Sequence, residues 1–307
     1  MEWFGAKLGP YYARKKNVTL SRNQKVTTWE GHEVAIDLYT PRGPRPAQGW
    51  PVAIMIHGGG WRFFSKDSHA LVAAQIAEMG FFTIATDYRL APKYPYPHGL
   101  IDVLSVYDWM HTQAQDLHLD LKNIVLAGES AGASFALGIS MLASGIATPK
   151  DLLHSGFESK KLDWSIPKKV IIHCGYHQVS NVARYDGKIS TLVRCRIRMI
   201  QKNYLPQSLK GDTRPHWGLA DPLCILEDLA EQGIKMTGTF PEVFIPVGER
   251  DPVLDDSVRL AKVLERLGQK PKLKIYPGAP HSFYAMPWNN QYANCWKDIE
   301  EFLSVSN

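Results

Sequence analysis

The sequence predicts an α/β fold with a mostly parallel, doubly wound central sheet, helices on both faces and a helical cap. The main observation is that short apolar runs alternate with helix-compatible segments up to about residue 175 and again from 242. Continuous apolar runs such as Pro51–Ile56 suit strands that are buried on both faces of a parallel sheet. A basic, proline-containing stretch at about 176–238 interrupts the alternation, so it is expected to form the cap.

Taken in order, the predicted elements fill most of the chain. Residues 1–20 are irregular or partly helical, and their aromatic residues suit a packed N-terminal arm or a lid. Strands are expected at 24–30, 32–39, 51–56, 81–86, 123–127, 168–174, 242–247 and 271–276. Helices are expected at 67–79, 99–114, 131–144, 190–203, 255–267 and 289–304. We expect a single domain over residues 1–307, with the stretch at about 176–238 as its cap.

Composition excludes several classes of protein. The chain has 45% hydrophobic and 21% charged residues, which is typical of a globular protein. Its net charge of +5 comes from scattered Lys and Arg, so no nucleic-acid partner is predicted. No apolar run is long enough for a membrane span, and no secretory signal is visible at the N-terminus. The four cysteines lack metal-site spacing and suit reduced thiols in a cytoplasmic protein.

The first candidate for chemistry is a serine between a predicted strand and a predicted helix. An apolar run at 124–127 leads into Gly128-Glu129-Ser130-Ala131-Gly132, and a small-residue segment follows. In the Gly-x-Ser-x-Gly pattern the serine occupies a sharp, strained turn and exposes its hydroxyl above the sheet. The pattern is short, and the simpler interpretation is a serine in an ordinary turn. The flanking strand and helix favour Ser130 as a nucleophile.

A serine nucleophile needs a base, and the base needs an orienting carboxylate. His281 and Asp251 each follow a predicted late strand, and the chain order Ser130, Asp251, His281 is typical of hydrolases on such a sheet. The simpler alternatives are a turn-forming Asp before proline and a surface-loop histidine. Asp255 and Asp256 are fallback carboxylates, although both are expected in the first turn of the next helix.

Attack on an ester carbonyl creates an oxyanion, which needs preorganised N–H donors. The run His57-Gly58-Gly59-Gly60 follows a buried strand, and its glycines let the backbone approach a substrate. The N–H of Ala131 is a further donor. His57 itself is expected to be a structural loop histidine. Trp61, Phe63 and Phe64 are expected to line the pocket, although aromatic residues at these positions equally suit the core.

Together these motifs resemble the hormone-sensitive-lipase-like carboxylesterases among the α/β-hydrolases. The stretches that carry the resemblance are HGGGW at 57–61, DYRLAP at 87–92, GESAGA at 128–133, GERDP at 248–252 and HSF at 281–283. Glu129 stands where Asp is commoner, but this departure removes no reacting group. The resemblance implies an α/β-hydrolase fold with these roles: nucleophile Ser130, acid Asp251, base His281, and oxyanion donors Gly59, Gly60 and Ala131. It also implies a cap built from about 1–20 and 176–238.

The leading hypothesis is a serine carboxylic-ester hydrolase that needs no metal and no cofactor. The resemblance implies esters of small to medium acyl chains as substrates. Acyl transfer, lactone chemistry or amide hydrolysis at the same triad in a biosynthetic pathway is the first alternative. A non-catalytic ligand-binding protein on this fold is the second. The basic helix at 190–203 suits an acidic or polar substrate, but also a solvated helix face; a homodimer is compatible with the sequence.

Overall fold

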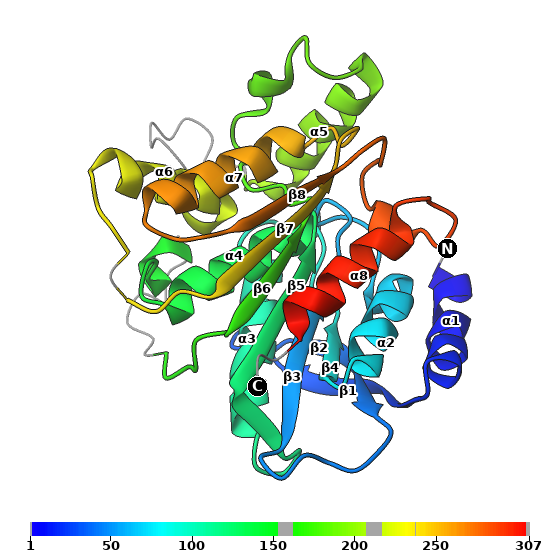
Figure 1. Ribbon diagram of the computed structural model, residues 1–307. Coiled ribbons are helices and arrows are strands. Elements are labelled where there is room, and N and C mark those ends of the chain that lie inside the picture. Colours follow the sequence, from blue (N-terminus) through cyan, green and yellow to red (C-terminus); the bar gives the residue numbers. More distant parts are fainter. Residues whose placement is uncertain (1, 153–161, 207–216, 237, 305–307) are drawn as a thin grey trace.

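The computed structural model describes residues 2–152, 162–206, 217–236 and 238–304 (Figure 1). In these ranges the strands form one eight-stranded sheet with the order β1-β2-β4-β3-β5-β6-β7-β8. β2 pairs antiparallel with β1 and β4, and all other neighbours are parallel. The strands are β1 (Val18–Thr27), β2 (Glu33–Pro41), β3 (Trp50–Ile56), β4 (Phe82–Thr86), β5 (Leu119–Glu129), β6 (Lys169–His173), β7 (Glu242–Gly248) and β8 (Lys272–Tyr276). The predicted fold class is confirmed.

Helices cover both faces of this sheet (Figure 1). On one face α2 (Ala70–Glu78) and α8 (Tyr292–Leu303) share a core cluster with alternate strand residues. A second core cluster lies on the other face, where the remaining strand side chains pack against four helices. These are α3 (His98–Thr112), α4 (Ala131–Ala143), α6 (Pro222–Glu231) and α7 (Leu254–Arg266). In β3, for example, Ile54 faces the second cluster and Met55 the first, because successive strand side chains point to opposite faces. Short 3₁₀ helices lie at Lys66–His69, Pro149–Leu152, Val182–Tyr185, Gly218–Ala220 and Phe283–Ala285.

Two parts of the chain differ from the sequence-based expectation. The N-terminal segment forms α1 (Glu2–Lys15), which packs on α2, and β1 then begins at Val18 rather than at 24. Helix α6 (Pro222–Glu231) lies in the proline-containing stretch, where the sequence predicts no helix after 190–203. Pro222 instead opens the helix, where its missing N–H costs nothing.

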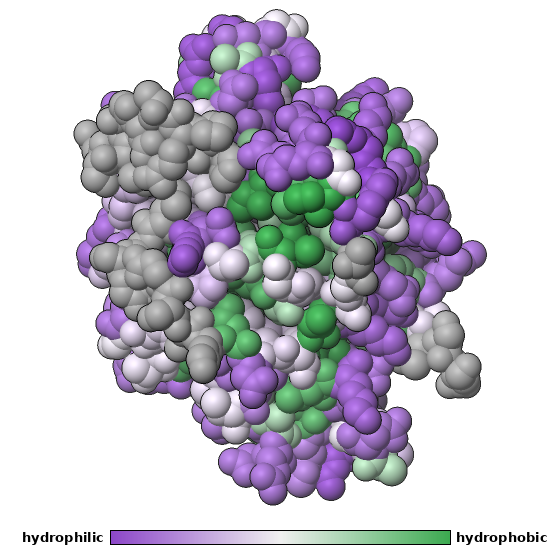
Figure 2. Space-filling model, turned by 90° about the vertical axis from the view of Figure 1, so that its left-hand side faces the viewer, coloured by the Kyte–Doolittle hydropathy of each residue, from purple (hydrophilic) through white to green (hydrophobic). Residues whose placement is uncertain are grey.

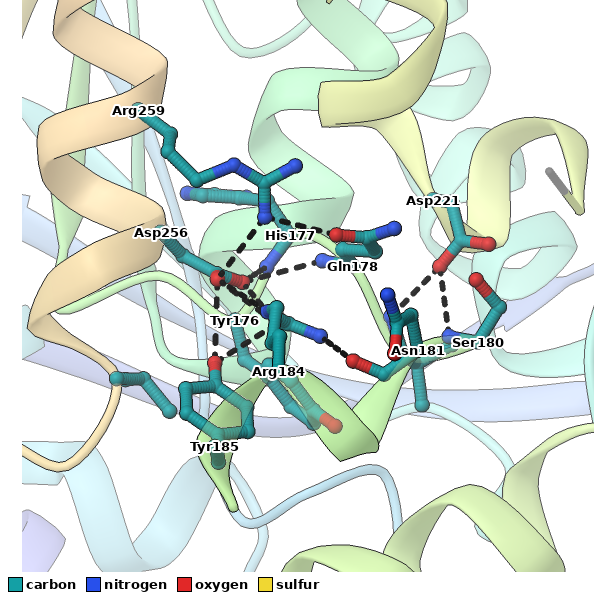
Figure 3. Close-up of polar contacts among 12 residues, drawn as sticks. Tyr176, His177, Gln178, Ser180, Asn181, Arg184, Tyr185, Asp221, Asp256 and Arg259 are labelled. Atoms are coloured by element: carbon teal, nitrogen blue, oxygen red, sulfur yellow. Dashed lines mark hydrogen bonds and ion pairs between the residues drawn. The ribbon is translucent and has the colours of Figure 1, made fainter. Parts of the chain in front are cut away.

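Helix α5 (Thr191–Tyr204) lies above the sheet in Figure 1 and belongs to the segment expected to be the cap. Two buried carboxylates hold the loop that leads to it (Figure 3). Asp256 Oδ2 accepts hydrogen bonds from the backbone N–H of His177 at 2.8 Å and of Gln178 at 3.2 Å. Asp221 Oδ1 accepts one from Val179 N at 2.6 Å. The base of α5 is therefore attached to the helices that pack on the sheet.

Within the described ranges, no helix is both long and apolar enough to cross a bilayer. The face shown in Figure 2 carries a central band of apolar residues between hydrophilic ones.

Candidate active site

Ser130 occupies a strained turn between β5 and α4. Its backbone angles are φ 50° and ψ −109°, a conformation that non-glycine residues rarely adopt. The turn is possible because Gly128 has no Cβ. A Cβ at this position would lie 2.3 Å from the carbonyl oxygen of Gly132, so only glycine fits. The backbone N–H of Ser130 donates to the carbonyl of His173 at 2.9 Å, which fixes the turn on the end of β6. These contacts hold the Ser130 side chain at the wall of a cavity.

The loops after β7 and β8 bring Asp251 and His281 together. His281 Nδ1 lies 2.8 Å from Asp251 Oδ2, and the Asp251 side chain is fully buried while that of His281 is 33% exposed. His281 lines the same cavity as Ser130. With Nδ1 on the carboxylate, Nε2 is the ring nitrogen left for proton transfer. No residue of the described ranges forms a hydrogen bond with Ser130 Oγ, which is common for nucleophiles in structures without substrate.

The electrostatics around His281 favour its protonated form. Burial by itself lowers the pKa of His281, but the buried Asp251 carboxylate that is hydrogen-bonded to its ring raises it above the ordinary value. Burial also raises the pKa of the Cys174 thiol, which therefore stays neutral. The negative charge beside the ring is thus the Asp251 carboxylate. An imidazolium formed during catalysis would be stabilised there.

The fallback carboxylate Asp256 lies in another network, and it does not contact His281. Its side chain is fully buried and accepts hydrogen bonds from Arg184 Nη2 at 2.7 Å and from the Tyr185 hydroxyl at 3.1 Å (Figure 3). Asp256 therefore serves the loop below α5. Of the carboxylates considered from the sequence, Asp251 is the one that contacts His281.

Gly59, Gly60 and Ala131 were expected to supply backbone N–H donors, and Ala131 directly follows Ser130. None of the three N–H groups has an acceptor in the part of the chain that the structure describes. Gly59 has φ 112°, and a Cβ there would lie 2.1 Å from the carbonyl oxygen of Phe63. Ala131 opens α4, where the first N–H groups have no partner within the helix. Gly59 and Gly60 line the cavity that Ser130 and His281 also line.

The cavity has a volume of about 590 Å³, within the range of small-molecule sites. Phe63 lines it, as the sequence predicted. The sequence did not single out Val193, Ile197 and Ile200 as lining residues, although their spacing on one face of α5 is a helical signal that could have found them. The lining also contains Arg62, Phe64, Glu129, Tyr176, Arg196, Met199, Pro252, Val253 and Ser282.

Trp61 is not a pocket residue, and the expectation for it was wrong. Its side chain is 1% exposed and stacks on Tyr204 with ring centroids 4.0 Å apart. Because Trp61 has φ 56°, the chain turns at this residue and directs the indole into the core below α5. His57 is structural, as expected: it is buried against Tyr88, and burial lowers its pKa to about 3.

Glu129 is the residue whose importance the sequence did not reveal. Its buried carboxylate lies 2.8 Å from His69 Nε2 and accepts hydrogen bonds from the hydroxyls of Ser282 at 2.7 Å and Tyr284 at 2.9 Å. Burial alone would raise the pKa of Glu129, but His69 and Ser282 contribute to lowering it well below its ordinary range. Glu129 therefore connects the turn of Ser130 to the loop of His281 as a carboxylate.

One group of side chains in the described ranges has the composition of a metal site. Ligand atoms of Cys174, Asp251 and His281 all lie within 4.8 Å of one another. The 2.8 Å hydrogen bond between Asp251 and His281 already accounts for this proximity. The spacing therefore makes no separate case for a metal.

Comparison with known proteins identifies the family. Residues 53–285 match the family described as alpha/beta hydrolase fold. This chain belongs to that family. The hydrolase is 26% identical to the ethyl acetate hydrolase of Pseudomonas putida over 268 residues. The aligned region covers 85% of this chain and 74% of the relative. It is 27% identical to carboxylesterase NlhH of Mycobacterium tuberculosis over 253 residues. That aligned region covers 82% of this chain and 71% of the relative.

Solved structures support the same fold. Esterase LipW from Mycobacterium marinum superimposes with a TM-score of 0.77 at 22% identity, over 98% of this hydrolase and 86% of that chain. A bacterial heroin esterase superimposes with a TM-score of 0.74 at 23% identity, over 99% and 91% of the two chains. The expected hormone-sensitive-lipase-like type is confirmed by the family match and the related sequences, and the protein is a hydrolase of the carboxylesterase type.

Proposed function

We propose that this hydrolase cleaves small to medium carboxylic esters with Ser130 as nucleophile, His281 as base and Asp251 as the orienting acid. The observation that carries the proposal is the 2.8 Å contact between His281 and Asp251 at the wall that also holds the strained Ser130. Ser130 Oγ attacks the ester carbonyl while His281 Nε2 takes its proton. The alcohol leaves with that proton, and water then attacks the acyl-enzyme and releases the acid.

The oxyanion of each tetrahedral intermediate would bind the N–H groups of Gly59, Gly60 and Ala131. Their lack of internal acceptors in the described ranges supports this role. We propose in addition that the segment 176–238 acts as a cap, since α5 supplies side chains to the cavity. A role of residues 1–20 in the cap has less support, because α1 packs on α2 and no residue of 1–20 is among the described lining residues.

A cytoplasmic location and a homodimer stay predictions. All four cysteines, which lie in described ranges, are free thiols, and this suits a reducing compartment. The substrate is expected to be a small molecule, since the cavity volume of about 590 Å³ is typical for such ligands.

The test is covalent labelling with a fluorophosphonate, read by intact mass, together with turnover of 4-nitrophenyl esters of increasing acyl length. We expect one label on the wild type, none on the Ser130→Ala variant, and turnover of short esters. Labelling without turnover would point to a different acyl acceptor, such as an amine or alcohol. A folded wild-type protein that is not labelled would contradict the triad and favour a non-catalytic binding protein.

A further inference from the structure

Two arginines at the cavity have no acidic partner. Arg62 and Arg196 both contribute to its lining, and in the described ranges neither forms an ion pair or a side-chain hydrogen bond with a carboxylate. Arg62 Nε is buried without a hydrogen-bond partner. Its guanidinium lies 5.0 Å from the ring of Phe63, so an aromatic wall positions the charge.

Three neighbouring arginines, in contrast, do have acidic partners. On α5, Arg194 and Arg198 lie four residues apart and contact Asp186, at 3.5 Å and 3.2 Å. Below α5, Arg184 contacts Asp256 at 2.7 Å (Figure 3). These three neighbouring arginines are thus paired with protein carboxylates, whereas Arg62 and Arg196 at the cavity wall have no such partner in the described ranges.

The remaining polar groups of the wall do not offset these charges. Glu129 is the one carboxylate among the described lining residues, and its oxygens already serve His69, Ser282 and Tyr284. Tyr176 also lines the cavity, and its buried hydroxyl has no partner in the described ranges. The wall therefore presents two guanidinium groups that no carboxylate of the described ranges neutralises, and a carboxylate is the ligand group that a guanidinium binds best.

We propose that the preferred substrates are esters that carry a carboxylate, which Arg62 and Arg196 bind while the ester group lies at Ser130. This inference rests on the proposed function of the site. The carboxylate belongs either to the acyl part, as in a half-ester of a dicarboxylic acid, or to the alcohol part. The apolar residues Val193, Ile197 and Ile200 would contact the chain between the two groups.

The test compares esters that differ only in charge. For the acyl side, mono-4-nitrophenyl adipate is compared with 4-nitrophenyl methyl adipate, and for the alcohol side 4-acetoxybenzoate with its methyl ester. We expect kcat/KM to be about tenfold higher for the charged member of at least one pair, as one partly exposed charged hydrogen bond would give. The preference should arise mainly in KM and decrease with added salt, since salt screens exposed charges.

Arg196→Gln is the main variant, because Arg196 is exposed and its replacement should not disturb folding. It should reduce the charged-to-neutral ratio to near one, and Arg62→Gln should reduce it as well. Arg198→Gln is the matched control: it removes the same charge from the same helix at a residue that contacts Asp186, and should leave the ratio unchanged. An equal loss of preference in both α5 variants would show a general field effect and overturn the proposal.

Failure of this proposal is distinguishable from failure of the proposed function. If wild type hydrolyses the neutral esters but shows no preference for the charged ones, the function stands and the inference is wrong. If nothing is hydrolysed, calorimetric titration of the Ser130→Ala protein with mono-4-nitrophenyl adipate still tests the inference. The inference is supported if the Ser130→Ala protein binds mono-4-nitrophenyl adipate at least about tenfold more tightly than 4-nitrophenyl methyl adipate, and if this preference is lost when Arg196→Gln is added. Equal binding of the two esters would contradict it.

Discussion

The Ser282 hydroxyl donates a hydrogen bond to Glu129 Oε1 at 2.7 Å, and so joins the residue after His281 to the residue before Ser130. These residues lie 153 positions apart in the chain. The distance between the proposed nucleophile and base therefore depends on a carboxylate that takes no direct part in the chemistry. This relationship leads to the first prediction.

Replacing Glu129 by Gln should lower both stability and activity. The amide keeps the size of the side chain but loses the charge and one acceptor, so one of the buried donors loses its partner. We expect a loss of about 1–3 kcal/mol in the free energy of unfolding, measured in urea, and a decrease of roughly tenfold in kcat. Ser282→Ala, which removes one of these bonds, should have a smaller effect; an unchanged kcat in Glu129→Gln would rule out the positioning role.

The pH dependence of activity should reflect the raised pKa of His281. A general base must be unprotonated, and a raised pKa keeps His281 protonated to higher pH. kcat/KM should therefore fall as the pH is lowered, with a midpoint above the ordinary histidine value of about 6.5. Asp251→Asn removes the adjacent negative charge and should move this midpoint down while reducing kcat by roughly 10³–10⁴-fold. A midpoint that is the same in both proteins would contradict the assignment of His281 as the titrating group.

Gly59→Ala should strongly reduce activity for a steric reason. The new Cβ would lie 2.1 Å from the Phe63 carbonyl oxygen, so the loop that holds the proposed oxyanion donors must move. We expect kcat to fall by roughly 100-fold or more. Gly31→Ala is the control, because Gly31 also has positive φ but its Cβ would meet nothing within 4 Å. It should cost about 1 kcal/mol of stability and leave kcat unchanged.

Ile200→Ala should change the preferred acyl length. Ile200 lines the cavity, and its Cδ1 would lie 2.7 Å from a Cβ on Gly60, so it packs directly on the glycine loop. Shortening it should enlarge the cavity and raise the relative kcat/KM of longer 4-nitrophenyl esters by roughly three- to tenfold. Leu192→Ala on the same helix, where the side chain is 64% exposed, should leave the profile as in wild type. Equal profiles for all three proteins would place the acyl chain elsewhere.

Asp256→Asn should destabilise the loop below α5. The change removes a buried charge that compensates Arg184, and breaking such a pair costs about 3–5 kcal/mol. Chemical denaturation should show this loss, while Asp255→Asn at the neighbouring position should cost about 0.5 kcal/mol or less. Equal stability of the Asp256→Asn and Asp255→Asn proteins would contradict the role of the Asp256 network in Figure 3 in holding the loop below α5.

Much of the fold and of the reacting groups could be predicted from local pattern. Buried parallel strands are apolar throughout, which made β3, β4 and β5 easy to find. The turn of Ser130 leaves a pattern because only glycine tolerates the close approach of strand and helix. Helix α6 was missed because a proline is equally typical of a loop and of the first position of a helix.

By itself, the sequence determined the α/β class, the family, the candidate nucleophile with its base and acid, and the glycine loop. These depend on periodicity and on short motifs, in which neighbours in the chain are also neighbours in space. Tertiary structure alone decided that Asp251 rather than Asp256 contacts His281, that Trp61 lies in the core, and that Glu129 connects two distant loops. It also decided which arginines of α5 have an acidic partner. The reason is physical: burial and pairing of charges depend on contacts between residues that are far apart in the chain.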